Sequence, residues 1–163
     1  MRKRSTKLMV NKERRLEPRD RTPKPPSMPI TYRVGNDLDL DQVQELYRGS
    51  TLGERRPVED RPRMAAMLRN ANLVVTAWDG DLLVGIARSV SDFVYCTYLS
   101  DLAVLVSHQR HGIGRELIRR TQQLGGQALL ILLSAPKAME YYPRIGLTQH
   151  PSAWMLKPED PLR

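Results

Sequence analysis

The first half of the chain has two kinds of hydrophobic spacing, which predict a strand followed by two helices. Ile30–Val34 alternates apolar and polar residues with a period of two, as a half-buried strand does. The next two segments have apolar residues three and four positions apart, as on one face of a helix. The first begins at Asp39 or Asp41, either of which can cap a helix, and runs to about Ser50, and the second covers Asp60–Asn70.

Beyond these helices the pattern predicts a hairpin and a further strand. Leu73–Trp78 and Leu82–Val90 are rich in apolar and β-branched residues, and Asp79-Gly80-Asp81 separates them. An Asp-Gly pair between two such runs is a strong signal for a tight turn. Phe93–Val106 then predicts a long strand.

The last third alternates helices and strands, and this order decides the fold class. Gly112–Leu124 has a helical spacing and stops at a pair of glycines. Ala128–Leu133 is apolar on both faces, as expected of a central strand that lies parallel to its neighbour. Lys137–Ile145 predicts a short helix, and Trp154–Leu156 predicts a last short strand. The whole order predicts an α/β fold with three layers, in which a mixed sheet of about six strands is flanked by about four helices.

Charge separates an N-terminal tail from the rest of the chain. Residues 1–29 contain ten lysine and arginine residues but three acidic ones, so they carry +7 of the net charge of +8. Such a segment, rich in proline as well, cannot build a core. We therefore predict a disordered basic tail at 1–29 and one domain at 30–163. A weak, salt-sensitive contact of the tail with RNA is one reading; a tail without a dedicated partner is favoured, so removal of Met1–Ser27 should change neither stability nor turnover.

Composition also narrows the class of protein. No apolar run approaches the roughly 20 residues that span a bilayer, and the N-terminus lacks the apolar segment of a secretory signal. The one cysteine, Cys96, excludes an internal disulfide, suits a reducing cytoplasm and lies in an apolar run that suits a buried thiol. His108, His111 and His150 have no acidic or cysteine companions at ligand spacing, so we predict no metal site. The first two are expected to be solvated.

The segment Tyr98–Leu117 contains the strongest chemical signal. An apolar strand breaks at Ser107-His108, passes through Gln109–Gly114 and continues with a helical pattern. The first amides of a helix have no partner inside it, and the helix dipole adds positive potential there, so such a turn can hold a phosphate. Gly112 and Gly114 have no Cβ, so a pyrophosphate can approach the backbone closely. A plain tight turn is the alternative, because the spacing matches neither of the two widespread nucleotide-binding loops.

Two motifs resemble those of the GNAT superfamily of N-acetyltransferases. Gln109–Gly114 has the spacing Q-x-x-G-x-G of the acyl-CoA loop in that superfamily. Ala138–Leu147 matches its A-x-x-[FY]-Y-x-x-x-G-[FL] motif at every marked position. The resemblance covers about Ile30–Leu156 and includes the order of the elements. It departs at Ala135, where many members have an asparagine that reaches the pantetheine arm, so that contact is absent here.

The resemblance implies acetyl-CoA as the acetyl donor and assigns residues to its binding. The end of the strand before the loop pairs with the pantetheine arm, and the same region supplies an N–H to the thioester oxygen. The loop amides hold the pyrophosphate, and an arginine adds charge. The residues so implied are Leu102, Ala103, Val104, Gln109, Arg110, His111, Gly112, Ile113, Gly114 and Arg115.

Two residues are candidates for the chemistry itself. Tyr142 matches the general acid of the superfamily, and a phenol with a pKa of about 10 can protonate a departing thiolate of similar basicity. Its neighbour Tyr141 is expected to belong to the core. Asp101 is a carboxylate inside an apolar strand, which is costly unless it is paired or faces a cavity. It either receives the amine or forms an ion pair with an arginine such as Arg88.

The predicted function is transfer of an acetyl group from acetyl-CoA to a primary amine, by direct attack in a ternary complex. The superfamily places Gly49–Pro57, with Arg55 and Arg56, on the acceptor side. The acceptor is a small-molecule or peptide amine, and Leu99–Val104 together with His150–Trp154 is similar to arylalkylamine-type enzymes. The rivals are acetylation of a protein N-terminus or lysine, and a nucleic-acid- or ribosome-associated module that uses the basic tail and a CoA-binding body. The sequence leaves the oligomeric state open, a homodimer included.

Overall fold

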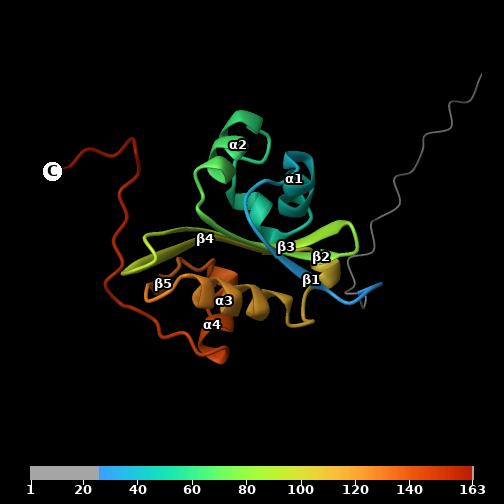
Figure 1. Cartoon of the computed structure of the whole chain (residues 1–163). Helices are drawn as coiled ribbons and strands as arrows, with labels where there is room; N and C mark the ends of the chain where they lie inside the picture. Colours follow the sequence, from blue (N-terminus) through green and yellow to red (C-terminus); the bar gives the residue numbers. More distant parts are fainter. Residues whose placement is uncertain (1–25, 163) are drawn as a thin grey trace, which may run out of the picture.

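One sheet runs through the molecule, with helices on both of its faces (Figure 1). The computed structural model describes residues 26–162. The strands lie side by side in chain order; the first four are antiparallel to their neighbours, and the fifth is parallel to the fourth. The predicted mixed sheet is therefore confirmed. The strands are β1 (Thr31–Val34), β2 (Leu73–Asp79), β3 (Leu82–Ser91), β4 (Cys96–Val104) and β5 (Leu129–Ile131).

The helices form the two outer layers. In Figure 1, α1 (Leu40–Arg48) and α2 (Arg61–Arg69) cover one face of the sheet, and α3 (Ile113–Leu124) and α4 (Tyr141–Arg144) cover the other. The three-layer α/β architecture is thus confirmed. Three short 3₁₀ turns connect the elements: η1 (Thr51–Arg55), η2 (Val106–His108) and η3 (Pro136–Ala138).

The ends of the first two helices follow the sequence closely. Asp39 is the N-cap of α1, and its side chain accepts a hydrogen bond from the backbone N–H of Asp41. Asp60 caps α2 in the same way through the N–H of Arg63. Each of these two helices buries an apolar stripe against the sheet, for example Leu46 of α1. A second hydrophobic cluster lies on the other face of the sheet, under α3, so the sheet separates two clusters.

β5 differs from its prediction in place and in length. It is parallel to β4 as expected, but it has three residues and forms the edge of the sheet instead of lying at its centre. Leu129 and Ile131 are 69% and 44% exposed, whereas Leu130 between them packs against the hydrophobic cluster under α3, so only one face of β5 is covered in the described residues. An apolar run on both faces therefore did not mean burial on both faces.

The predicted last strand is absent from the described part of the chain. Trp154–Leu156 has no strand partner, and Trp154 is 93% exposed. The sheet accordingly has five strands and not about six. The long strand predicted from Phe93 also begins later, at Cys96, because the carboxylate of Asp92 accepts the N–H groups of Val94, Tyr95 and Cys96 and holds a turn there.

Most of the predicted tail lies outside the described residues. Ser27 and Met28 are described, and both donate hydrogen bonds to the carboxylate of Asp79 at the end of β2. These two residues therefore contact the domain, although the sequence assigned them to the tail. None of the helices between residues 26 and 162 combines the length and the apolar character needed to span a bilayer.

Candidate active site

The turn between β4 and α3 leaves the first amides of that helix open. The chain passes through two residues with left-handed backbone conformation, Arg110 (φ 65°) and Gly112 (φ 80°). Gly112 is the N-cap of α3 and supplies no side-chain acceptor. Within residues 26–162 no protein group accepts a hydrogen bond from the N–H groups of residues 110–115. Open amides and the dipole at a helix N-terminus suit an anion, so the geometry is compatible with the phosphate site that the sequence analysis expects, which stays a prediction.

The two glycines leave different amounts of room at this turn. A Cβ added at Gly112 would have no atom within 4 Å, so this side of the turn is open. A Cβ added at Gly114 would lie 3.4 Å from the hydroxyl oxygen of Tyr141 and 3.8 Å from a methyl group of Val104. Gly114 therefore marks the point where β4, α3 and α4 come together.

β4 has an unpaired edge just before the turn. β5 pairs only with Cys96–Tyr98, so within the described residues nothing pairs with Leu99–Val104 on that side. The side chain of Gln109 donates to the carbonyl oxygen of Val104 (3.1 Å) and fixes the start of the loop to this edge. The open stretch contains the three residues predicted to meet the pantetheine arm, Leu102, Ala103 and Val104.

Two tyrosines at the start of α4 lie near the same turn. Tyr141 is exposed, with its hydroxyl group toward Gly114, and so it is not the core residue that the sequence suggested. Tyr142 is half-buried and packs against the hydrophobic cluster under α3. Their rings meet edge to face with centroids 5.4 Å apart. Burial raises the pKa of both phenols, so both keep their protons at neutral pH.

Asp101 lies in a buried cluster of ions. Its side chain is 0% exposed and contacts Arg88 (2.5 Å), Arg56 (2.5 Å) and the hydroxyl group of Tyr47 (2.8 Å). A shift in the register of β3 and β4 after Arg88 places Asp101 directly opposite that arginine. Burial by itself raises the pKa of Asp101, but the hydrogen bonds and charges of Arg88 and Arg56 outweigh it and lower the pKa. The ion pair that the sequence left as an alternative is therefore present, and both carboxylate oxygens are engaged.

Arg56, which the sequence analysis placed on the acceptor side, is also a partner of Asp101, and this contact was not predicted. Besides Asp101, it donates to the carbonyl oxygen of Ser100 (2.7 Å), and its side chain is 22% exposed. It thereby fastens the segment after η1 to the centre of β4. A buried carboxylate such as Asp101 needs cationic partners. The adjacent arginines Arg55 and Arg56 were therefore the sequence signal from which this contact could have been predicted.

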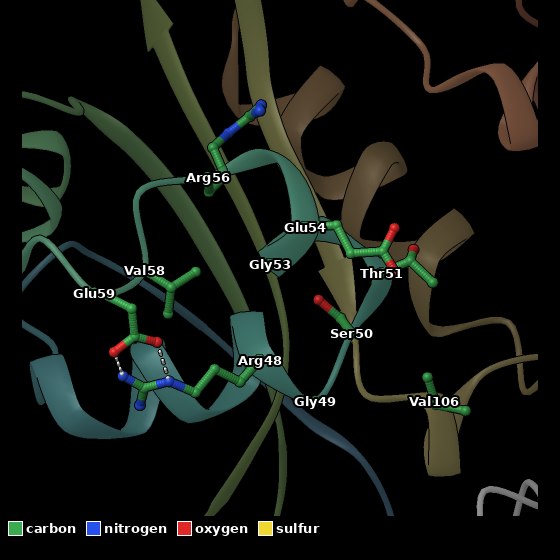
Figure 2. A pocket seen from close by; sticks show the side chains of 10 residues that line it. All are labelled: Arg48, Gly49, Ser50, Thr51, Gly53, Glu54, Arg56, Val58, Glu59 and Val106. Atoms are coloured by element: carbon green, nitrogen blue, oxygen red, sulfur yellow. Dashed lines mark hydrogen bonds and ion pairs between the residues drawn. The ribbon is translucent and has the colours of Figure 1, made fainter.

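A cavity of about 370 Å³ lies beside this segment (Figure 2). Arg48 and Glu59 at its wall neutralise each other through an ion pair of 2.9 Å. In Figure 2 the side chains of Thr51 and Glu54 extend to the same side of η1. Glu54 has no ion pair among residues 26–162. The other lining residues are Gly49, Ser50, Gly53, Arg56, Val58 and Val106. The cavity therefore lies between the predicted acceptor segment and η2, which follows β4.

The two histidines near the turn differ from each other. His111 is exposed, as expected. His108 was expected to be solvated, but it is 8% exposed, and its Nε2 lies 3.2 Å from a carboxylate oxygen of Asp79. The prediction was wrong because the hairpin between β2 and β3 covers this histidine, a contact between residues 29 positions apart in the chain.

Comparison with known proteins agrees with this geometry. Residues 40–147 match the model of the acetyltransferase (GNAT) family. An uncharacterized ycf52-like N-acetyltransferase of Prochlorococcus marinus is 30% identical over 121 residues, which are 70% of this chain and 65% of that protein. The chain thus spans just under two thirds of the length of this relative.

Solved structures show the same fold at low sequence identity. The aminoglycoside N-acetyltransferase AAC(6')-Iy in complex with CoA superposes with a TM-score of 0.63 at 15% identity, over 80% of this chain and 95% of that one. An aminoglycoside acetyltransferase from an uncultured soil metagenomic sample, in complex with sisomicin, gives a TM-score of 0.61 at 20% identity, over 82% and 97%. At such identities the likeness shows a shared fold. With the family match over most of the domain, it confirms the resemblance read from the two motifs: the chain belongs to the GNAT family of acetyltransferases.

Proposed function

We propose that this protein transfers an acetyl group from acetyl-CoA to a primary amine, by direct attack of the amine in a ternary complex. The observation that carries the proposal is the meeting of three features at one place. The open amides of α3, the unpaired edge of β4 and Tyr141 of α4 meet at Gly114. Family membership supplies the class of reaction.

The residues at the turn fit the charge and shape of acetyl-CoA, which supplies the acetyl thioester. The N–H groups of residues 110–115 have no acceptor within the described protein and bind a diphosphate, while the exposed side chains of Arg110 and Arg115 add positive charge. The free edge of β4 at Leu99–Val104 has the backbone donors and acceptors that an extended, amide-bearing chain needs. An N–H of this edge also polarises a carbonyl group that lies along it.

Tyr142 supplies the proton for the departing sulfur. Burial and the neighbouring phenol of Tyr141 raise its pKa, whereas the charge of Arg55 lowers it. The phenol is protonated at neutral pH and can donate its proton to a departing thiolate of similar basicity. Tyr141, whose hydroxyl group is turned toward Gly114, is the competing donor.

Asp101 acts on the site through other residues. Because both its oxygens are engaged by arginines, it does not serve as a free base; it holds Arg56, and with it the segment after η1, against β4. We assign to Asp101 a positioning role in place of the catalytic one that the sequence proposed.

The cavity beside η1 receives the acceptor. Its volume of about 370 Å³ suits a small amine or the end of a single side chain. Glu54 carries a carboxylate that no described cation neutralises, so it binds an ammonium group and accepts its proton, directly or through water. Small amines and peptide amines, including lysine and a protein N-terminus, share this chemistry.

One measurement tests the proposal. The purified full chain is incubated with acetyl-CoA and a panel of arylalkylamines, amino acids, aminoglycosides and lysine peptides, and the free thiol is recorded over time. We expect amine-dependent thiol release with at least one class of acceptor and an N-acetyl product by mass spectrometry. Binding of CoA without release on any amine would contradict the proposed transfer and leave a CoA-binding protein.

A further inference from the structure

The carboxylate of Asp79, at the end of β2, collects four hydrogen-bond partners. The backbone N–H of Ser27 donates to one oxygen (2.8 Å), and the hydroxyl group of Ser27 and the N–H of Met28 donate to the other (2.8 and 2.9 Å). Nε2 of His108 is the fourth partner, at 3.2 Å. The N–H of Ser27 contributes most to a pKa of about 2 for Asp79, so the carboxylate is ionised at neutral pH.

A hairpin turn alone does not need these contacts. Gly80 supplies the left-handed conformation of the turn (φ 62°), and Asp81, the other acidic residue in it, is exposed. Asp79 instead is buried, and the methyl end of Met28 lies over the turn, 3.0 Å from where a Cβ at Gly80 would be. Two acidic residues of one turn thus have different environments, and only Asp79 faces the rest of the domain.

His108 connects this carboxylate to the loop. It is the last residue of η2, directly before Gln109–Gly114. Its ring is held on both sides, by Asp79 at Nε2 and by the hydroxyl group of Ser107 at Nδ1 (2.8 Å). The backbone N–H of His108 donates to the carbonyl oxygen of Leu105 (2.8 Å). The ring and the backbone of His108 are therefore both held at the entry to the turn.

We propose that Asp79 is a positioning residue for acetyl-CoA: it fixes His108 and through it the entry to the loop, and Ser27 and Met28 hold Asp79 in place. The inference rests on the proposed function and extends it, because it makes residues 27 and 28 a working part of the domain. The loop binds acetyl-CoA through backbone amides, so the affinity for acetyl-CoA depends on the position and orientation of these amides. A displacement of these groups by about 1 Å can cost a large factor in binding or rate.

The test uses four variants of the full chain. Asp79→Asn removes the negative charge with little change in size, Ser27→Ala removes one hydroxyl group, and Ser27→Thr keeps it. Asp81→Asn is the matched control in the same turn. For each protein, CoA affinity is measured by calorimetry, KM for acetyl-CoA and for the acceptor by thiol release, and Tm by thermal unfolding.

We expect Asp79→Asn to raise both the Kd of CoA and KM for acetyl-CoA about tenfold, with kcat and the acceptor KM changed less than about twofold. Ser27→Ala should show the same pattern at about two- to threefold, and Ser27→Thr and Asp81→Asn should match the parent. If Asp79→Asn does not fold, the pair Ser27→Ala and Ser27→Thr decides the matter.

Two results would overturn the inference and can be told apart. Variants with a lowered Tm but parental CoA affinity would show that the contacts serve stability alone, and the proposed transfer would stand. A parent protein that binds no CoA would remove the proposed function and the positioning role together.

Discussion

At the scale of single residues, two adjacent tyrosines compete for the role of general acid. Tyr142→Phe keeps the ring and its packing but removes the proton, so we expect kcat to fall by about 10²–10⁴-fold while CoA affinity is kept. Tyr141→Phe is the matched control, because it removes a hydroxyl group one position away. Steady-state kinetics of both variants give the answer: a large loss with Tyr141→Phe alone would move the role to Tyr141.

Asp101→Asn tests whether the buried ion cluster belongs to the fold or to the chemistry. The change leaves Arg88 and Arg56 beside a neutral group, so the free energy of unfolding should drop by about 3 kcal/mol. KM for acetyl-CoA should hold, and any rise in the acceptor KM should appear with every acceptor, because the segment after η1 loosens as a whole. Denaturant unfolding and kinetics on the same variant check this. Parental stability with a greatly reduced kcat would restore the catalytic assignment.

The same carboxylate predicts how stability depends on pH. The pKa of Asp101 is lower in the folded protein than its unfolded value of about 3.9, so its contribution is present above about pH 4 and is lost as the pH falls through the folded pKa. The stability difference between the parent and Asp101→Asn should therefore be constant from neutral pH down to about pH 5 and shrink below about pH 4. Urea unfolding across this range measures it. A difference that instead grows as the pH falls from neutral would mean a raised pKa.

At the scale of elements, the β4–α3 turn predicts a graded response at Gly114. A methyl group there makes only ordinary contacts with Tyr141 and Val104, so Gly114→Ala should fold and bind CoA nearly as the parent does. Gly114→Val adds bulk beside the open amides and should weaken CoA binding at least about tenfold. Calorimetry with CoA distinguishes the two. Gly112 is a poorer test, because its φ of 80° strains any other residue.

The elements also show what periodicity can and cannot predict. Helix starts and the hairpin depend on residues close in sequence, so the sequence could offer Asp39, beside Asp41, as a cap, could start the second helix within one residue of its place and could assign the Asp79-Gly80 turn correctly. The position of a strand in the sheet depends on its neighbours. Ala128–Leu133 carried no sign that its outer side would stay open, and the apolar Trp154–Leu156 none that it would lack a strand partner.

For the candidate site, the difference is again between local and distant contacts. The loop glycines, Tyr142 and the end of β4 could be nominated from motifs because each motif lies within a few residues, and their roles stay predictions. The contact between Arg56 and Asp101 and the contact between Asp79 and His108 could not be found in this way, because they join residues 45 and 29 positions apart. A strand register shifted by a bulge also decided that Arg88 faces Asp101, and sequence spacing alone does not locate a bulge.

At the scale of the whole molecule, charge divides the chain in a way that allows a clean experiment. All ten basic residues of the predicted tail lie within residues 2–24, before the contacts of Ser27 and Met28 with Asp79 begin. The rest of the chain carries about +1 of the net +8. Tail and positioning contacts can therefore be removed separately, which the original prediction for deletion of Met1–Ser27 did not allow for.

A chain that lacks residues 2–24 should keep the Tm and the turnover of the full chain, because a charged, proline-rich segment adds little buried surface. We expect the full chain to be retained weakly on RNA or heparin, with a retention that falls steeply with salt because contacts with a polyanion release counterions. The shortened chain should lose this retention. Salt-gradient chromatography and thiol release on both proteins test this.

The Ser27→Ala substitution added to the shortened chain should then raise KM for acetyl-CoA as it does in the full chain. Equal retention of both proteins would place the polyanion contact on the domain, and lost turnover would place the tail in the reaction itself.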